Sequence, residues 1–294
     1  MSAGVIINPI AGTHARFSVG ARIQLARDVL ERCGIEGQVT VTERRDHGRE
    51  LAAALVAEGV DTLVVWGGDG SVNEVASEVA FRGPVLGIVP AGSGNGLARE
   101  LHLEWDPARA LETALTGRPR RIDAGELGGR LFFNVAGVGI DAHLAAAFNA
   151  LSHRGGLAYF QTAWREVARY EPRVYTVRAG ELEVTEPALA IAVANTRQYG
   201  NRAIIAPLAR PDDGLLELVM LPPLSPLAIL WQARRLFTGS VHRVPGVRMH
   251  SVREVEIVAD GPLAFHVDGE AATGHNTLSA KVHPHALQVR VPAS

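Results

Sequence analysis

The chain has 294 residues, of which 47% are hydrophobic, and its formal net charge is −2. This length indicates about two domains, each large enough for its own core, and the near-neutral charge excludes the global basic field that attracts nucleic acid. The single cysteine, Cys33, excludes an intrachain disulfide and fits a reducing compartment such as the cytoplasm.

Neither a signal peptide nor a membrane-spanning helix is expected. Val5, Ile6 and Ile7 open a strand almost at once, with no basic region ahead of a long apolar segment. The longest apolar stretch, 215–231, contains Glu217 and prolines that would break a spanning helix. We therefore expect a protein that is not integral to a membrane.

The first part of the chain, residues 4 to about 125, alternates short apolar runs with amphipathic ones. This pattern is typical of an α/β domain with a doubly wound parallel sheet. Strands are predicted at 5–8, 38–42, 63–66 and 84–90, helices at 18–33 and 50–58, and further helices after the glycine-rich loops that begin at 67 and 91.

Three of these strands end in loops of small residues, at 8–13, 67–71 and 91–96. Ligands of open parallel sheets bind at the carboxyl ends of the strands, so the three loops could share one site. Free amides at a helix start attract phosphate, and Asp69 or Ser71 could cap the helix after the second loop. Asp69 would repel a bare phosphate but suits a magnesium ion or a hydroxyl proton, so the loops indicate nucleotide chemistry.

From about Leu127 the pattern changes to short alternating runs separated by turn residues, which predicts an antiparallel β domain. The predicted domains are 1–124 and 125–285, and a tail, 286–294, that returns to the first. Strands are predicted at 174–177, 182–184, 188–194, 215–221, 255–258 and 264–267, and helical insertions at 142–150, 156–170 and 227–237.

Six blocks, in order, carry a resemblance to a known family. The first three, NP-x-AG at 8–12, GGDGSVNEV at 67–75 and PAGSGNGLAREL at 90–101, fit neither the Rossmann nor the Walker pattern. The others are LFFNVAGVGIDAHL at 131–144, residues 193–218, and FHVDGEAA at 265–272. Together they resemble the diacylglycerol kinase catalytic domain family, which includes bacterial lipid kinases and sphingosine and ceramide kinases. The resemblance implies an NAD kinase-like first domain and a C-terminal β-sandwich.

The resemblance also implies roles for individual residues. Asp268 and Glu270 would reach the reacting hydroxyl, and Glu270 would accept its proton. Because phosphoryl transfer needs charge neutralisation, Asp69 and Asp268 are also expected as ligands or water-mediated partners of Mg²⁺. A structural magnesium site would use the side chain of Asp213 and the backbone carbonyls of Arg210 and Leu215. The residues that would bind ATP are Asn8, Pro9, Ala11, Gly12, Thr42, Gly67, Gly68, Gly70, Ser71, Asn73, Glu74 and Ser93.

Several positions keep structural alternatives open. Asp268-Gly269 and Asp213-Gly214 are also common turn pairs. Arg16, Arg22 and Arg99 are candidate phosphate partners or solvated surface arginines.

Gly96 stands where bacterial members commonly have aspartate, which leaves the identity of the lipid open.

The sequence therefore predicts an ATP- and Mg²⁺-dependent lipid kinase that phosphorylates a hydroxyl of a membrane lipid, such as diacylglycerol or a sphingoid base. Its expected location is cytoplasmic and peripheral at the inner membrane face, with homodimer formation left open and no nucleic-acid partner. Two alternatives remain: a kinase of a soluble substrate, akin to NAD kinase, and a catalytically silent nucleotide or lipid sensor.

Overall fold

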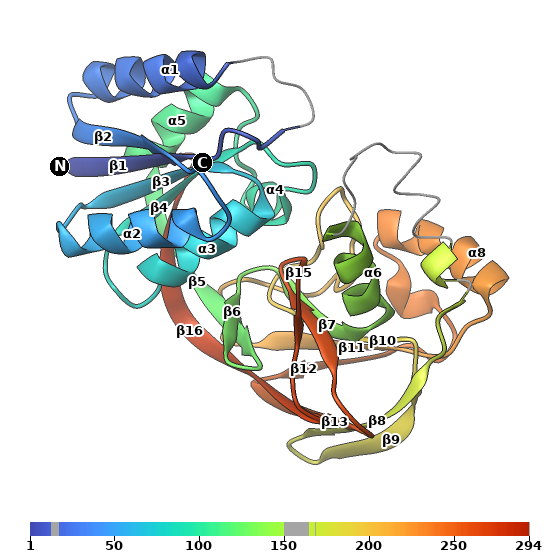
Figure 1. The fold of residues 1–294 in the computed structure, drawn as a ribbon. Coiled ribbons are helices and arrows are strands. Elements are labelled where there is room, and N and C mark those ends of the chain that lie inside the picture. The colour runs from blue at the N-terminus through green and yellow to red at the C-terminus, as the bar shows by residue number, and fades with distance from the viewer. Residues whose placement is uncertain (13–17, 150–164, 168, 294) are drawn as a thin grey trace. The chain divides into compact units, whose positions relative to one another are not determined.

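The computed structural model describes residues 1–12, 18–149, 165–167 and 169–293 (Figure 1). The chain forms two compact units, Met1–Asp123 with His285–Ser294 and Ala124–Pro284. The first unit ends one residue before the domain boundary that the sequence predicts. Among the described residues, no helix combines the length and the apolar character needed to cross a membrane.

The first unit contains a parallel sheet in the order β2-β1-β3-β4, followed by the end of β16. The strands are β1 (Ser2–Ile7), β2 (Glu36–Val41), β3 (Thr62–Gly67), β4 (Val85–Pro90) and β16 (Thr277–Val291). Every residue of β3 is buried, as expected for a central parallel strand that helices cover on both faces.

Helices cover both faces of this sheet (Figure 1). They are α1 (Val19–Arg32), α2 (His47–Ala57), α3 (Asp69–Val79), α4 (Gly96–Glu100) and α5 (Pro107–Thr116). Val5, Val64 and Trp66 pack in one core with residues of α1 and α5, whereas Gly4, on the opposite side of β1, faces Leu55 of α2. This alternation confirms the doubly wound α/β fold.

The second unit is an antiparallel β-sandwich, which also confirms the prediction. One sheet has the order β12-β11-β10-β7-β14-β15. Its strands are β7 (Val135–Gly139), β10 (Ala190–Ala194), β11 (Leu216–Leu221), β12 (Arg248–Val252), β14 (Ala264–Val267) and β15 (Glu270–Thr273). The other contains the last part of β5 (Arg118–Leu127), β6 (Arg130–Phe132), β8 (Arg173–Ala179), β9 (Leu182–Ala188), β13 (Glu254–Ala259) and the first part of β16. Ile191, Leu218 and Ile257 belong to the core between the sheets.

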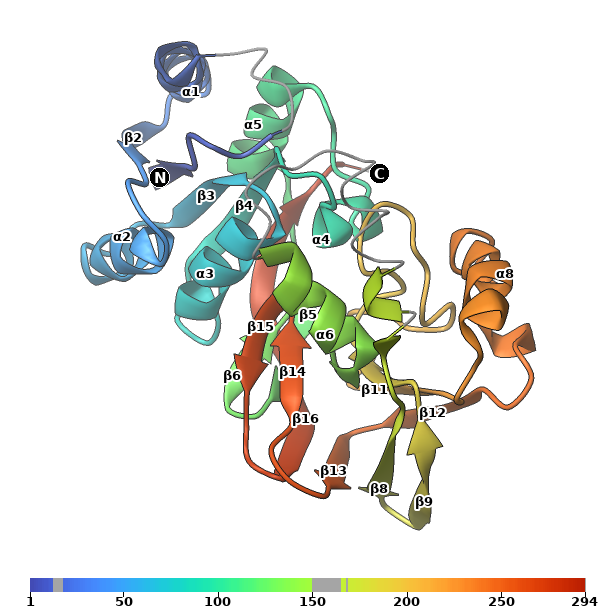
Figure 2. The ribbon, with the colours of Figure 1, turned by 45° about the vertical axis from the view of Figure 1, so that its right-hand side comes forward.

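Helices α6 (Ile140–Asn149) and α8 (Pro226–Phe237) and the 3-10 helix η1 (Val241–Arg243) complete the described part of this unit. Helix α6 runs beside β14 and β15 (Figure 2). The predicted helix at 156–170 lies mostly outside the described residues. The predicted strand at 188–194 is wrong at its start, because β9 ends at Ala188 and β10 begins at Ala190. Strands β5, β6, β7, β12 and β15 were not predicted. The short segments of β12 and β15 lack an apolar run, whereas β7 is a buried run, VAGVG, that the sequence analysis missed.

Candidate active-site residues

The three loops of small residues at 8–13, 67–71 and 91–96, here called the three glycine-rich loops, are bonded to one another. Because β1, β3 and β4 are neighbours in the sheet, their carboxyl ends lie at the same edge. The amide of Asn8 donates to the carbonyl of Trp66 at 2.9 Å, and the amide of Ala91 donates to the carbonyl of Gly67 at 2.9 Å. Asn8 Nδ2 also donates to Ser71 Oγ at 2.8 Å. The first loop is therefore joined to the second, and the second to the third.

The second and third loops touch backbone to backbone. A Cβ on Gly92 would lie 2.6 Å from the Cα of Gly68, and a Cβ on Gly68 would lie 3.0 Å from the Cα of Gly92. A Cβ on Gly67 would lie 2.5 Å from the Cβ of Ser71. Gly68 and Gly92 need glycine because no side chain fits between the two main chains, and Gly67 needs glycine because a Cβ there would collide with the Ser71 side chain.

The expected side-chain cap of α3 is wrong. Gly68 is the N-cap, so the N-cap residue supplies no side-chain hydrogen bond to the helix start. Asp69, the first helical residue, is bonded instead to the third loop: Oδ2 accepts from the amide of Asn95 and Oδ1 from the amide of Gly96, each at 2.7 Å. The carboxylate therefore determines the path of the third loop.

Asn95 is a structural residue that the sequence reasoning missed. Its φ of 50° lies in the left-handed region, which asparagine tolerates better than most residues. Its Oδ1 accepts from the amide of Gly92 at 2.8 Å, and its Nδ2 donates to the carbonyl of Gly92 at 2.6 Å. The asparagine inside SGNG was the available signal, because asparagine side chains often bond to nearby backbone in turns.

Arg22 supports the first loop from within the unit. Its side chain is buried, with 6% exposure, and it lies 5.7 Å from the ring centroid of Trp66. Nη1 donates to the carbonyl of Asn8 at 3.1 Å and Nη2 to the carbonyl of Ala11 at 3.0 Å. Burial lowers the pKa of Arg22 from its ordinary value. The surface alternative is therefore wrong for this arginine.

Arg99 has a comparable role in the third loop. Its Nε donates to the carbonyl of Gly94 at 2.9 Å, and its guanidinium lies 4.5 Å from the ring centroid of Trp105. These contacts support the loop from the side of α4. The third candidate, Arg16, lies outside the described residues.

Glu74, which is predicted to bind the nucleotide, contacts the start of α2. Its Oε1 accepts from the amide of Asp46 at 3.2 Å and its Oε2 from the amide of Gly48 at 3.1 Å. Helix α2 has no cap from its own N-cap side chain, so Glu74 satisfies amides that would otherwise lack an intrahelical partner. These contacts give Glu74 a structural role.

The other predicted nucleotide residues differ in exposure. Ser93 is exposed, whereas Thr42 and Asn73 are buried. A Cβ on Gly12 would lie 3.2 Å from the carbonyl oxygen of Ala91, which places the first loop close to the third. Pro9 and Gly70 are half-buried.

In the second unit, Asp268 and Gly269 form the two-residue turn between β14 and β15. Their φ values are 48° and 86°, as a type I′ hairpin turn requires. Val267 pairs with Glu270 across this turn. The turn alternative is therefore correct, and the turn places Glu270, which is half-buried, at the start of β15.

The carboxylate of Asp268 accepts three backbone hydrogen bonds. Oδ2 accepts from the amide of Phe133 at 2.9 Å, and Oδ1 accepts from those of Asn134 at 2.9 Å and Val135 at 3.2 Å. The amide of Asp268 donates to the carbonyl of Val135 at 3.0 Å. Asp268 thus attaches the hairpin to the start of β7, a role that its sequence position did not reveal.

A buried polar network supports the same turn. His266 is 3% exposed, and its Nδ1 accepts weakly from the amide of Gly269 at 3.4 Å. Its Nε2 lies 3.3 Å from Asp141 Oδ2, which also accepts from Tyr199 Oη at 3.1 Å. The acceptor role of Nδ1 assigns the proton to Nε2 in the neutral ring. Burial and the Asp141 carboxylate raise the pKa of Tyr199 well above its ordinary value.

The predicted structural magnesium residues lie in a turn before β11. Asp213 is exposed, and its Oδ1 accepts from the amide of Leu215 at 3.1 Å. Within the described ranges, no three or more His, Cys, Asp or Glu side chains are grouped as a metal site. The predicted site, which uses the carboxylate of Asp213 and the backbone carbonyls of Arg210 and Leu215, is not a group of that kind. It stays a prediction.

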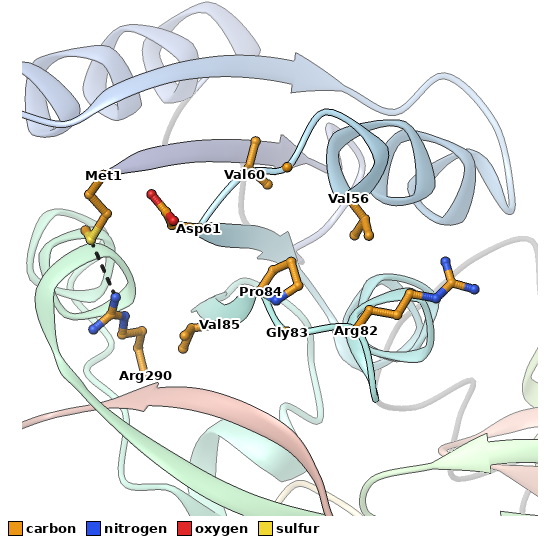
Figure 3. Close-up of a pocket in the computed structure, with 10 residues that line it drawn as sticks. Met1, Val56, Val60, Asp61, Arg82, Gly83, Pro84, Val85 and Arg290 are labelled. Atoms are coloured by element: carbon orange, nitrogen blue, oxygen red, sulfur yellow. Dashed lines mark hydrogen bonds between the residues drawn. The ribbon is translucent and has the colours of Figure 1, made fainter.

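A cavity of about 650 Å³ lies at the opposite edge of the first unit's sheet, where the strands begin (Figure 3). Asp61 and Arg290 are among the residues that line it, and Arg290 Nη2 lies 3.7 Å from Met1 Sδ. The glycine-rich loops lie at the carboxyl ends of the strands, where ligands of parallel sheets bind, so this cavity is separate from them.

Comparison with known families and proteins gives a consistent result. Residues 2–127 match the model of the diacylglycerol kinase catalytic domain. Residues 134–291 match that of the YegS C-terminal NAD kinase beta sandwich-like domain.

Two relatives, from Chromohalobacter salexigens and Pseudomonas aeruginosa PAO1, are named probable lipid kinase YegS-like. The first relative is 33% identical, and the alignment covers 86% of this chain and 83% of the relative. The second is 32% identical, and the alignment covers 95% of this chain and 93% of the relative. A solved structure described as a diacylglycerol kinase from Bacillus anthracis has a TM-score of 0.76 at 16% identity and covers 99% of this chain and 96% of its own. A second structure from that organism, with the same coverage, has a TM-score of 0.81 at 18% identity. At these identities the two structures show a shared fold.

Proposed function

Because the chain belongs to the family of diacylglycerol kinases and YegS-like lipid kinases and is a kinase, we propose that it transfers the γ-phosphate of ATP to a hydroxyl of a membrane lipid. Diacylglycerol and sphingoid bases are the acceptor classes that we favour. In this proposal the first unit binds the nucleotide and the second supplies the catalytic base.

The arrangement of the three glycine-rich loops carries this proposal. Gly68 and Gly92 are in backbone contact, so the second and third loops lie against each other at the edge of the sheet where ligands of parallel sheets bind. The N-cap of α3 is Gly68, which supplies no side-chain cap, and the amides at such a helix start suit a phosphate. Asn95 and Asp69 hold this geometry before any nucleotide binds, which reduces the cost of ordering the loops.

Magnesium fits the same loops. Mg²⁺ in kinase sites is usually held by one or two carboxylates together with phosphate oxygens and water, so a dedicated cluster of acidic side chains is not required. Asp69 would hold the ion, because it provides a hard carboxylate at the start of α3. The bound ion would neutralise charge on the transferred phosphoryl group. Asp268 fits this role less well, because its two oxygens accept three backbone amides.

Glu270 is the proposed general base. The Asp268-Gly269 turn and its attachment to β7 orient the residue that follows them, and Glu270 would take the proton of the acceptor hydroxyl as the phosphoryl group transfers. The side chain can be changed without changing the backbone pairing with Val267, which makes the role testable.

The experiment uses the full chain with Mg²⁺, labelled ATP and separate micelles of diacylglycerol, sphingoid base, ceramide and phosphatidylglycerol, with NAD as a soluble acceptor. We expect one lipid to be labelled. Glu270→Gln should lower turnover by about 10²-fold or more while ATP binding is retained. Glu254→Gln, an exposed change on β13, is the matched control.

Labelling of NAD without any lipid would favour the soluble-substrate alternative. ATP binding without transfer to any acceptor would favour the silent sensor. Full turnover by Glu270→Gln would refute the assigned base.

A further inference from the structure

Helix α8 is apolar on the side that packs against the protein. Ile229 packs against a cluster that contains Leu189 and Ala190, and Leu236 packs against one that contains Ala206 and Val241. These contacts form the packed side of α8. In an ordinary amphipathic helix the opposite, outer side is polar.

The outer side of α8 is apolar as well. Leu227 is 74% exposed, Leu230 49%, Trp231 60% and Phe237 62%. Positions 227, 230, 231, 234 and 237 follow helical spacing and form one stripe, which we call the outer face of α8. Four of the ten large hydrophobic side chains exposed in the described part of the chain lie on this single helix. Such clustering indicates an interaction surface, because isolated exposed hydrophobics are usually scattered.

Helix α8 itself is basic, since it contains two arginines and no aspartate or glutamate. Arg234 belongs to the stripe, and its guanidinium lies 3.8 Å from the ring centroid of Trp231. Arg235 occupies the same last turn of the helix. An apolar stripe with aromatic and arginine side chains matches the composition of helices that lie in the interface of anionic membranes.

We propose that the outer face of α8 docks the protein on the surface of an anionic lipid bilayer. Leu227, Leu230 and Trp231 enter the boundary between headgroups and acyl chains, and Arg234 and Arg235 bind lipid phosphates. The inference rests on the proposed function, since a kinase of a membrane lipid must reach its acceptor at the bilayer.

A second copy of the chain fits this surface less well. In a two-fold contact the same patch lies on both partners, so the arginines of α8 would face arginines with no carboxylate from either copy of α8 between them. A lipid phosphate provides the opposite charge. The membrane is therefore the occupant that the charge pattern favours.

The test is sedimentation of the full chain, without nucleotide, with vesicles of phosphatidylcholine alone or mixed with phosphatidylglycerol. We expect at least about tenfold stronger binding to the mixed vesicles. The double variant Leu227→Gln/Trp231→Gln should bind them at least about tenfold more weakly, and Arg234→Gln about fivefold more weakly. Both changes lie on exposed positions, and circular dichroism checks that the variants are folded.

Trp105→Gln is the matched control, because Trp105 is 51% exposed and also lies under an arginine, Arg99, at 4.5 Å. It should bind vesicles like the wild type. Equal binding by the α8 variants and the wild type, or equal loss in the control, overturns the proposal. A wild-type dimer that becomes monomeric in the α8 variants, without vesicle binding, also overturns it in favour of a second copy.

The measurement is independent of phosphoryl transfer. Vesicle binding through α8 by a chain that phosphorylates no lipid supports the docking surface and contradicts the proposed function. Lipid phosphorylation without α8-dependent vesicle binding contradicts the docking surface alone.

Discussion

The carboxylate of Asp69 and the main-chain amide of Asn95 are 2.7 Å apart, although the residues are 26 positions apart in the sequence. This bond joins the second glycine-rich loop to the third. It means that the aspartate of GGDG shapes the loops in addition to the magnesium-binding role proposed for it.

The first prediction concerns Asp69→Asn. The amides of Asn95 and Gly96 point at different oxygens of the carboxylate, so the asparagine side chain would present its NH2 donor to one of them. We expect the unfolding free energy to fall by about 1.5–3 kcal/mol, measured by urea denaturation. Turnover should fall far more than ATP affinity, because the negative charge matters most in the transferring complex.

Asp28→Asn, at an exposed position on α1, is the control and should match the wild type in both measurements. Unchanged stability in Asp69→Asn would show that its bonds to the third loop contribute nothing to folding. Equal losses of turnover and of ATP affinity would contradict a role centred on transfer.

The second prediction concerns Gly92→Ala. The added Cβ would lie 2.6 Å from the Cα of Gly68, so the two loops must separate. We expect ATP affinity to fall by at least about tenfold and stability by about 1–3 kcal/mol, measured by isothermal titration and thermal unfolding.

Gly20→Ala is the matched control, since its Cβ would have only the Ser18 hydroxyl nearby, at 4.0 Å, and it lies in α1. That change should raise stability by about 0.5–1 kcal/mol. Normal ATP binding by Gly92→Ala would show that the backbone contact is not needed for the site.

The third prediction separates Asp268 from Glu270. Asp268→Asn replaces an acceptor of three amides with a side chain that presents a donor to some of them, so we expect a loss of about 2–3 kcal/mol in unfolding free energy. Asparagine also tolerates the left-handed backbone, so the turn itself is preserved. Glu270→Gln should leave stability within about 0.5 kcal/mol of the wild type. Equal stability of the two variants would contradict the structural role of Asp268.

The fourth prediction concerns alkaline pH. Burial and Asp141 raise the pKa of Tyr199 above that of a tyrosine in the unfolded chain, so the folded state holds this proton more tightly. The resulting stability is fully present below the unfolded pKa of about 10 and is lost as pH rises above it. Urea denaturation of Tyr199→Phe should therefore show a smaller loss of stability between pH 9 and 11, by up to about 1.4 kcal/mol.

Tyr170 and Tyr175, whose pKa values burial also raises, should still produce part of that alkaline loss in the variant. At pH 8 the variant should be less stable than the wild type by about 1 kcal/mol, since its bond to Asp141 is absent. Identical pH profiles for the two proteins would rule out the linkage.

Local patterns in the sequence determined much of the fold. Buried apolar runs identified β1, β3 and β4, and Ser18 marked the start of α1, where its side chain accepts from the amide of Ala21. These features depend on residues close in the chain, whose periodicity is visible directly. The strand β15 lacks such a pattern. It forms because it pairs with β14 across a two-residue turn.

The sequence by itself also determined the family, because six ordered motifs identify it without coordinates. Only the tertiary structure decided what Asp69, Glu74 and Asp268 contact, since their partners are distant in sequence. It also decided which side of α8 is exposed, because that helix is apolar on both sides and periodicity cannot tell the packed side from the outer one. The physical reason is the same in each case: a motif specifies side-chain chemistry, whereas partners and exposure depend on how distant segments pack.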